Sequence, residues 1–216
     1  MTRSQPGAPE PRPSLAERAF ALAYDPLTAM AERGGLGRIR RQLIAPLAGR
    51  VVEIGAGTGA NLAHYRPAVD LTACEPAQPM RRRLERAVSG RPGTEISSAP
   101  AEHLPVGDAS VDALVSTLVL CTVVDPRAAL TEARRVLRTD GMLVVLEHVR
   151  GRPGLHAGVQ DLVAPAWRKL ACGCRPNQET EALLKEAGFV WVRRFRHDLP
   201  VPLVSPLVAG VLTPGP

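Results

Sequence analysis

Along this chain, short runs of apolar residues alternate with segments in which apolar residues recur at every third or fourth position. The runs predict β-strands, and the longer spacing predicts amphipathic helices. Because the two patterns alternate regularly, the chain is expected to form an α/β fold with a doubly wound, mostly parallel sheet of seven strands. The expected strands are 51–54, 70–74, 94–97, 111–117, 142–147, 189–196 and 207–212.

The N-terminal segment has a different pattern. Residues 1–13 contain four prolines and almost no apolar residues, which predicts a disordered, Pro-rich tail. Ser14 is typical of a helix N-cap, and the helix that follows it is expected to break at Asp25-Pro26. A second helical stretch is expected at about 37–48. We expect these N-terminal helices to cover the sheet where the substrate binds, and residues 14–216 to form a single domain.

The composition narrows the choice of partners. Apolar residues make up 45% of the 216 residues but aromatic residues only 3%, so Leu, Val and Ala are expected to dominate the core. The net charge is +6, and all of the 27 basic residues except Lys169 and Lys185 are arginine. The arginine clusters are short and lack the interleaved aromatic residues on which bases stack. We therefore expect a small-molecule partner and no nucleic acid.

The cysteine pattern bears on the cellular compartment. The four cysteines, at 74, 121, 172 and 174, form no C-x-x-C pair, so neither a metal site nor a disulfide framework is expected. Free thiols are typical of a reducing cytoplasm. The first twelve residues lack the apolar core of a signal peptide, and the apolar run at 113–124 is too short to span a bilayer. No stable membrane anchor is expected, and nothing in the pattern indicates an oligomeric state.

The stretch V-V-E-I-G-A-G-T-G-A-N at 51–61 joins the first strand to a glycine-rich loop. Glycines at the end of a strand let a ligand approach the backbone N–H groups closely. With Ala60, the loop matches the G-x-G-x-x-A pattern of dinucleotide-binding dehydrogenases. With Glu53 in front of Gly55, it matches the E-x-G-x-G-x-G pattern of loops that bind S-adenosyl-L-methionine.

Two acidic residues bear on this choice. Glu53 would repel a pyrophosphate, but it can pair with the α-amino group of a methionine moiety, directly or through water. Glu75 ends the next strand, where a carboxylate can accept both ribose hydroxyls of an adenosyl group. Because Glu75 fits NAD equally well, the preference for S-adenosyl-L-methionine rests on Glu53 and on the residues that follow.

Four sequence blocks resemble the class I S-adenosylmethionine-dependent methyltransferases, and in particular their type-11 domains. These blocks are Glu53 to Gly59, Glu75-Pro76, A-E-H-L-P at 101–105 and D-A-S-V-D-A-L-V at 108–115. Their order and spacing agree with the family over about residues 50–150. The resemblance implies a Rossmann-like sheet and S-adenosyl-L-methionine as the cofactor. It implies these cofactor-binding residues: Glu53, Gly55, Ala56, Gly57, Gly59, Asn61, Glu75, Pro76, Ala101, Glu102 and Thr117.

The similarity extends to about residue 200. The segments at 116–125, 146–149 and 164–167, together with Gly173-Cys174, resemble the methyltransferase-like seven group, which are thiol S-methyltransferases. This resemblance implies a thiol acceptor. The animal members begin with an apolar membrane anchor, whereas this chain begins with a polar, Pro-rich segment, so a soluble, bacterial-type enzyme is expected.

Methyl transfer needs a positioned acceptor and a group that removes its proton. The acceptor pocket is expected beyond the carboxyl ends of the fourth and fifth strands, next to Glu147 and His148. His148 is the first candidate for a general base, because an imidazole titrates near neutral pH; a structural histidine is the alternative. Cys121 is interpreted as an apolar pocket residue rather than a nucleophile. The residues expected to line the acceptor pocket are Phe20, Tyr24, Cys121 and Trp167.

Three alternatives stay open at this point. O- or C-methylation of a quinone or natural-product scaffold fits the same four blocks. A non-catalytic cofactor-binding protein is also compatible with the fold, although the intact glycine loop argues against it. An NAD(P)-dependent oxidoreductase would be expected to show a catalytic Tyr/Lys pair, and neither Tyr24 nor Tyr65 is placed to provide one.

Overall fold

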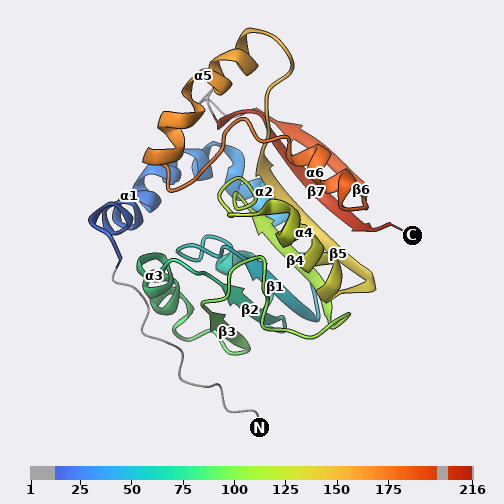
Figure 1. Cartoon of the computed structure of the whole chain (residues 1–216). Helices are drawn as coiled ribbons and strands as arrows, with labels where there is room; N and C mark the ends of the chain where they lie inside the picture. The colour runs from blue at the N-terminus through green and yellow to red at the C-terminus, as the bar shows by residue number, and fades with distance from the viewer. Residues whose placement is uncertain (1–12, 199–203, 216) are drawn as a thin grey trace.

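The computed structural model describes residues 13–198 and 204–215, so the predicted tail lies, apart from Pro13, outside the described residues. Seven strands form one sheet in the order β3-β2-β1-β4-β5-β7-β6 (Figure 1). The strands are β1 (Arg50–Ile54), β2 (Asp70–Cys74), β3 (Thr94–Ser97), β4 (Val111–Thr117), β5 (Leu137–His148), β6 (Phe189–His197) and β7 (Leu207–Pro214). These bounds confirm the predicted strands, and β5 begins five residues earlier than expected.

The sheet is mostly parallel, as predicted. The strands β3, β2, β1, β4 and β5 pair in parallel, whereas β7 runs antiparallel to both β5 and β6. The early start of β5 comes from an irregularity, since Val111 pairs with Leu137 but Ala113 pairs with Met142. The additional residues bulge between these two pairs.

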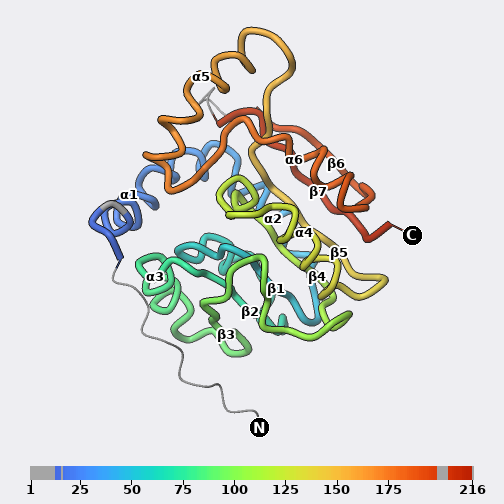
Figure 2. The backbone as a smooth tube through the Cα atoms, viewed as in Figure 1, coloured from blue at the N-terminus to red at the C-terminus, as the bar shows by residue number. Residues whose placement is uncertain are grey.

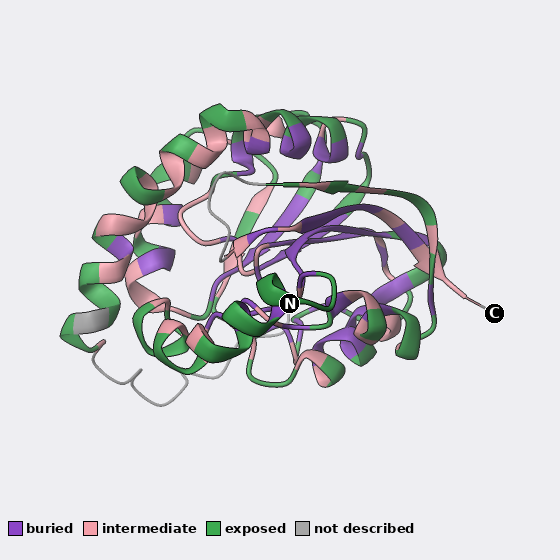
Figure 3. Cartoon of the chain, turned by 90° about the horizontal axis from the view of Figure 1, so that it is seen from above, coloured by how far each residue is buried: buried purple, intermediate pink, exposed green. Residues whose placement is uncertain are grey.

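Side chains alternate between two cores, one on each face of the sheet. In β1, Val51 belongs to one core and Val52 to the other, and Val144 and Val145 of β5 divide in the same way. Helices cover both faces, which explains why the central strands read as continuous apolar runs. Figure 3 shows the buried strands between helices whose outer faces are exposed.

Helices α2 and α3 pack on one face of the sheet, and α4 and α6 pack on the other. The α-helices are α1 (Leu15–Ala31), α2 (Gly37–Ile44), α3 (Gln78–Val88), α4 (Pro126–Val136), α5 (Leu155–Leu170) and α6 (Thr180–Glu186). A π-helical turn, η1 (Glu32–Leu36), joins α1 to α2, and a 3-10 turn, η2 (Leu62–His64), follows the glycine loop. None of the described helices is both long and apolar enough to cross a bilayer.

Two expectations about the N-terminal helices were wrong in detail. The chain does not break at Asp25-Pro26, because α1 continues through Pro26 to Ala31. Proline removes the hydrogen bond to the carbonyl of Leu22, but Leu22 is exposed to water, and the Thr28 hydroxyl donates to the carbonyl of Tyr24. The second helix ends at Ile44 rather than near 48.

Because β1, β2, β4 and β5 are parallel, their carboxyl ends meet at one edge of the sheet, where open α/β sheets bind ligands. Helix α1 lies over this edge. After α5, the chain returns toward α1 and then crosses to α6, which brings residues 171–178 over the same edge (Figure 2). The sheet therefore supplies a floor, and α1 with the segment at 171–178 supplies a roof.

Candidate active site

A cavity of about 390 Å³ opens between the strand ends and α1. This volume lies within the range of sites for small molecules and cofactors. Nine of the predicted site residues line it: Phe20, Tyr24, Gly55, Gly57, Glu75, Pro76, Ala101, Glu102 and Thr117. Glu53, Ala56, Gly59, Asn61, Cys121, Glu147, His148 and Trp167 are not part of its lining.

The glycine loop forms the centre of the floor. Gly55, Gly57 and Gly59 have φ values of 54°, 61° and 94°, in the left-handed region that favours glycine. A Cβ on Gly55 would lie 2.6 Å from a methyl group of Val119, so a side chain there would also clash. The loop continues into the 3-10 turn η2. Only a short stretch remains before β2, and Pro67 within it limits further helical winding.

Glu75 ties the glycine loop to the end of β2. One of its carboxylate oxygens accepts a hydrogen bond from Gly57 N at 2.8 Å, and the other accepts one from Ala77 N at 2.8 Å. Burial raises the pKa of Glu75, and the two backbone N–H groups oppose this shift. A carboxylate can accept about four hydrogen bonds, so Glu75 can accept two more from a ligand in the cavity.

The cavity is acidic. Glu17, Glu75 and Glu102 line it, and its lining, drawn from the described residues, contains no Arg, Lys or His. Carboxylates in a concave site favour cationic ligands and disfavour a pyrophosphate. The residues present therefore fit a cofactor that carries a sulfonium and an ammonium group, and they fit NAD poorly.

Glu53 lies beneath the glycine loop and is buried. Its carboxylate accepts hydrogen bonds from Asn61 Nδ2 at 2.9 Å and from the Tyr65 hydroxyl at 2.8 Å. Burial raises its pKa to about 7, although these two donors oppose the shift. Ala56 and Gly59 hold the loop itself, since Ala56 N donates to Cys74 O and Gly59 N donates to Ala56 O.

Arg40 of α2 was not predicted as part of the site. It is buried, and its guanidinium donates to Glu32, to Asn61 Oδ1 at 2.8 Å and to the Thr117 hydroxyl at 2.9 Å. Asn61 Nδ2 also donates to Thr117. A signal was present in the sequence, because Arg40 shares a helical face with the apolar residues Leu36, Ile39, Leu43 and Ile44. A buried arginine on such a face needs polar partners.

Asp25, interpreted from sequence as a helix breaker, instead joins the roof to the floor. Its carboxylate accepts hydrogen bonds from the Thr58 hydroxyl in the glycine loop, at 2.6 Å, and from Arg83 of α3. No sequence motif marks this contact, since its partners are 33 and 58 residues away.

The segment that follows β3 forms another wall of the cavity. Pro100, Ala101 and Glu102 line it, and Glu102 accepts a hydrogen bond from Asp125 N at 3.0 Å. Asp125 in turn caps α4 by accepting from Arg127 N and Ala128 N. The A-E block is thereby held against the start of α4.

Two of the four residues predicted for the acceptor pocket lie at the cavity. Phe20 and Tyr24 of α1 line it, with their ring centroids 5.6 Å apart. Cys121 is buried behind the cavity, with its Sγ atom 3.7 Å from Cys174 Sγ. Trp167 lies on α5 outside the lining.

Glu147 and His148, at the end of β5, are both buried. The Glu147 carboxylate accepts from the Ser116 hydroxyl at 2.6 Å and from the N–H groups of Val119 and Leu120, so it holds the loop after β4. Burial raises its pKa to about 7. Nδ1 of His148 lies 2.7 Å from Val204 O, and burial lowers the pKa of this imidazole to about 4.

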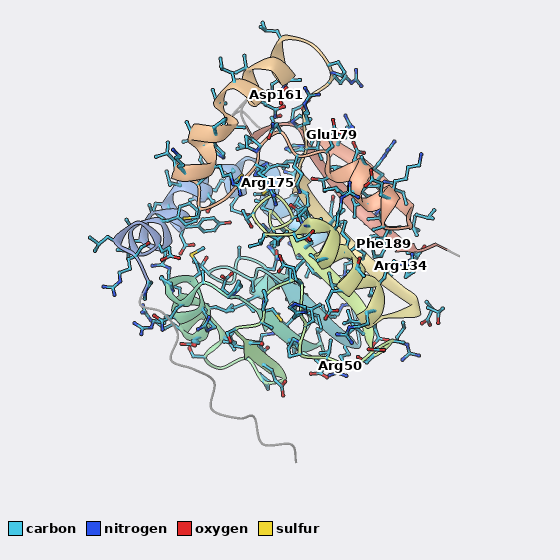
Figure 4. The ribbon with its side chains drawn as sticks, in the orientation of Figure 1. Arg50, Arg134, Asp161, Arg175, Glu179 and Phe189 are labelled. Carbon is cyan, nitrogen blue, oxygen red and sulfur yellow. The ribbon has the colours of Figure 1, made fainter. Side chains whose placement is uncertain are left out.

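The roof segment at 171–178 is fastened to the loop after β4. Arg175, labelled in Figure 4, donates from its side chain to the carbonyls of Cys121 and Val123, and its backbone N–H also donates to Cys121 O. The Gln178 side chain donates to Leu120 O at 2.7 Å. These bonds place Ala171 and Cys172 at the cavity.

Within residues 13–198 and 204–215, no group of His, Cys, Asp or Glu side chains is arranged to hold a metal ion. A doubly wound sheet with a glycine loop, an acid at the end of β2 and an acidic cavity above both defines a nucleotide-cofactor-binding α/β protein. A family model described as a methyltransferase domain matches residues 52–145. Together with the relatives described next, this match shows that the chain belongs to the S-adenosylmethionine-dependent methyltransferase family, as the sequence blocks predicted.

Several relatives support this family assignment. Human thiol S-methyltransferase TMT1B is 34% identical over 70% of this chain and 64% of its own length. Human thiol S-methyltransferase TMT1A is 31% identical over 74% of this chain and 68% of its own. Demethylmenaquinone methyltransferase of Clavibacter sepedonicus is 31% identical over 69% of each chain. The chain spans less than two thirds of the length of the human and rat TMT1B proteins.

A solved structure supports the fold. The crystal structure of a possible histamine N-methyltransferase from Thermotoga maritima superposes with a TM-score of 0.69 and 22% identity. The superposition covers 92% of this chain and 98% of that one. The Rossmann-like architecture predicted from the sequence is therefore confirmed over nearly the whole chain.

Proposed function

We propose that this protein transfers a methyl group from S-adenosyl-L-methionine to a small, largely apolar acceptor, and that the acceptor atom is a thiol sulfur. The acidic cavity at the carboxyl ends of β1, β2 and β4 is the observation that carries the proposal. It favours a cationic cofactor over a dinucleotide, and it is bordered by an apolar wall from α1.

In this proposal, the floor binds the cofactor. Glu75 accepts the ribose hydroxyls, and the backbone at Gly55 and Gly57 lies against the methionine part. Glu53 attracts the ammonium group from beneath the loop, directly or through water. Pro76, Ala101 and Glu102 enclose the adenine. Thr117 lines the cavity at the end of β4, and its hydroxyl is held by hydrogen bonds from Arg40 and Asn61.

Bound S-adenosyl-L-methionine supplies a methyl group that is activated by its sulfonium sulfur. The protein has to orient the acceptor in line with that methyl group and exclude water. Phe20 and Tyr24 provide an apolar surface for this purpose, and Cys172 also lines the cavity. A thiol reacts as its thiolate, so the acceptor proton leaves before or during transfer.

The similarity to two human thiol S-methyltransferases supports sulfur as the acceptor atom. The similarity to a demethylmenaquinone methyltransferase supports C-methylation of a quinone as the second candidate. The role of His148 as general base stays a prediction. Its position outside the cavity lining, and its pKa of about 4, favour a structural role.

The proposal includes the cytoplasm as the compartment. All four cysteines are free thiols in the described structure. The cysteine spacing, which contains no C-x-x-C pair and no pattern of a disulfide framework, supports this compartment.

Two measurements on the full-length protein test the proposal. In thermal shift assays, S-adenosyl-L-methionine and S-adenosyl-L-homocysteine should raise Tm, and NAD should not, because ligands that bind only the folded state stabilise it. Stabilisation by NAD alone would overturn the cofactor assignment.

Turnover assays then separate the acceptors. Alkyl and aryl thiols should be methylated faster than quinols or phenols of similar size. Methylation of quinols alone would favour the second candidate. Cofactor binding without turnover of any acceptor class would favour a non-catalytic binding protein.

A further inference from the structure

The exposed apolar residues of this protein are concentrated on two helices. Twelve large apolar side chains of the described structure are exposed, and eight of them lie on α1 or α5. Those eight are Leu15, Leu22, Leu27, Met30, Leu155, Val159, Leu162 and Leu170. Single exposed apolar residues are common on protein surfaces, whereas a concentration of this kind marks an interaction site.

On α5 the exposed apolar residues form a continuous stripe. Leu155, Val159, Leu162 and Leu170 follow the helical spacing, and Ala166 completes the row. The exposed fractions of Leu155, Leu162 and Leu170 are 88%, 81% and 77%. The opposite face of α5 carries its buried residues, Ala157 and Gln160. The helix therefore presents its more apolar face to solvent.

A second stripe lies on α1. Leu15, Leu22 and Met30, exposed by 83%, 69% and 73%, lie on one side of the helix, whereas Leu27 lies on the side of Phe20. The buried side carries Ala21, and Phe20 and Tyr24 face the cavity. The helix is thus apolar both toward the cavity and toward solvent.

Both stripes adjoin the mouth of the cavity. Phe20 and Tyr24 of α1 line one side of it, and Ala171 and Cys172, directly after α5, line another. An occupant that covered the stripes would therefore lie beside the acceptor entrance. Figure 1 shows α1 and α5 at the same end of the molecule.

The charges around the stripes are mainly positive. Arg18, Arg82 and Arg86 line a groove between α1 and α3, and Lys169 lies on the exposed side of α5. Two of the nearby acids are paired, since Asp25 contacts Arg83 and Asp161 contacts Arg150. Glu17 accepts hydrogen bonds from Ser14 at the start of α1, and Glu85 lies beside Arg82 and Arg86. Figure 4 shows Asp161 on α5. Apolar faces flanked by cations complement a surface that is apolar beneath a layer of negative charge.

We propose that the stripes on α1 and α5 dock the protein reversibly on an anionic lipid bilayer. The leucines enter the boundary between head groups and acyl chains, and the arginines contact the lipid phosphates. The cavity mouth then faces the membrane, so an apolar acceptor dissolved in the lipid reaches the site without crossing bulk water. The docking surface does not depend on which atom of the acceptor is methylated.

Sedimentation with vesicles tests this proposal on the full-length protein. The protein should bind vesicles of phosphatidylcholine and phosphatidylglycerol, bind pure phosphatidylcholine at least tenfold more weakly, and dissociate as salt is added. The double variant Leu155→Glu/Leu162→Glu should lose binding by more than tenfold. Val192→Glu, exposed by 66% on β6, is the matched control and should bind like the natural sequence.

Further measurements test whether the double variant is folded and whether a second copy of the chain covers the stripes. Leu155 and Leu162 do not line the cavity, so the double variant should keep its affinity for S-adenosyl-L-homocysteine and its rate with a water-soluble acceptor. Vesicle binding that survives the double substitution would overturn the proposal, as would no binding of the natural sequence. A dimer in sedimentation velocity that this variant dissociates would show that a second copy covers the stripes instead.

Discussion

The floor of the cavity, formed by the strand ends and the glycine loop, differs from its roof, formed by α1 and residues 171–178, in how its polar groups are used. In the floor, Glu53, Asn61 and Glu75 are buried, and each has at least two polar partners. In the roof, α1 presents mainly apolar side chains, and four of the large ones are exposed to solvent.

This difference has consequences for rigidity. Buried polar groups that are fully hydrogen-bonded fix one arrangement, because any other arrangement leaves a donor or acceptor unpaired. The roof is attached to the floor through fewer polar contacts, mainly those of Asp25, Arg175 and Gln178. The floor is therefore suited to one cofactor, and the roof can vary with the acceptor without disturbing it.

The largest effect is expected from Glu75→Ala in the floor. This change removes the acceptor for Gly57 N and Ala77 N as well as the proposed partner of the ribose hydroxyls. Hydrogen bonds to a charged group contribute about 1.5–3 kcal/mol each, so the affinity for S-adenosyl-L-methionine should fall by about 100-fold or more. Isothermal titration calorimetry measures the change.

Glu95→Ala is the matched control for this substitution. Glu95 is exposed on β3, which pairs with β2, and does not line the cavity. Its replacement should leave the affinity within about twofold. Unchanged affinity in Glu75→Ala would refute the placement of the ribose, and with it the assignment of the floor to the cofactor.

The floor could be predicted from the sequence because its contacts are local to strand ends. Glycines that need positive φ, and acids that end β1 and β2, follow directly from the order of the strands. The same reasoning failed for Arg40 and Asp25, whose partners lie far away in the sequence. Arg40 is 77 residues from Thr117, and Asp25 is 58 residues from Arg83.

The roof was predicted less well for a further physical reason. Helical periodicity identifies an apolar face but not what covers it, so Phe20 and Tyr24 at the cavity could not be separated from Leu22 in solvent. Trp167 and Cys121 were assigned to the acceptor pocket by their chemistry, and the structure places both outside the cavity lining. The bulged start of β5 also depends on pairing with β4, which no local pattern reveals.

Cofactor binding should weaken as the pH falls below 7. The pKa of Glu53 is raised to about 7, and in its proposed role the carboxylate attracts the ammonium group only when ionised. Its ionised fraction falls from about one half at pH 7 to about one thirtieth at pH 5.5, so the affinity should fall more than tenfold over this range. Calorimetry across this pH range measures the slope.

Glu53→Gln sharpens this prediction. Glutamine does not titrate, so the variant should bind weakly with a flatter pH profile. Some slope should persist, because burial also raises the pKa of Glu75. A variant profile as steep as that of the natural sequence would show that Glu53 does not act on the cofactor.

A smaller effect is expected where the roof joins the floor. Asp25→Asn removes the charge that holds Arg83 and weakens the contact with Thr58 of the glycine loop. The Asp25 side chain is 44% exposed, so solvent screening limits the contribution to about 1 kcal/mol and the loss of cofactor affinity to about fivefold. Asp140→Asn, at an exposed pair with Arg138 on β5, should have no effect. If both variants bind alike, the roof does not organise the glycine loop.

The smallest effect on turnover is expected from His148→Ala, and this variant decides whether catalytic groups extend beyond the cavity. The imidazole is buried outside the lining and contacts Val204 O, so turnover under saturating substrates should change less than about threefold.

The stability of the folded protein should respond to this substitution instead. Since the folded pKa is about 4 and the unfolded value about 6.5, the neutral ring contributes fully above pH 6.5, and this contribution is lost as the pH falls toward 4. Denaturant unfolding of the variant should lack this component, whereas a more than tenfold loss of turnover would identify His148 as the base.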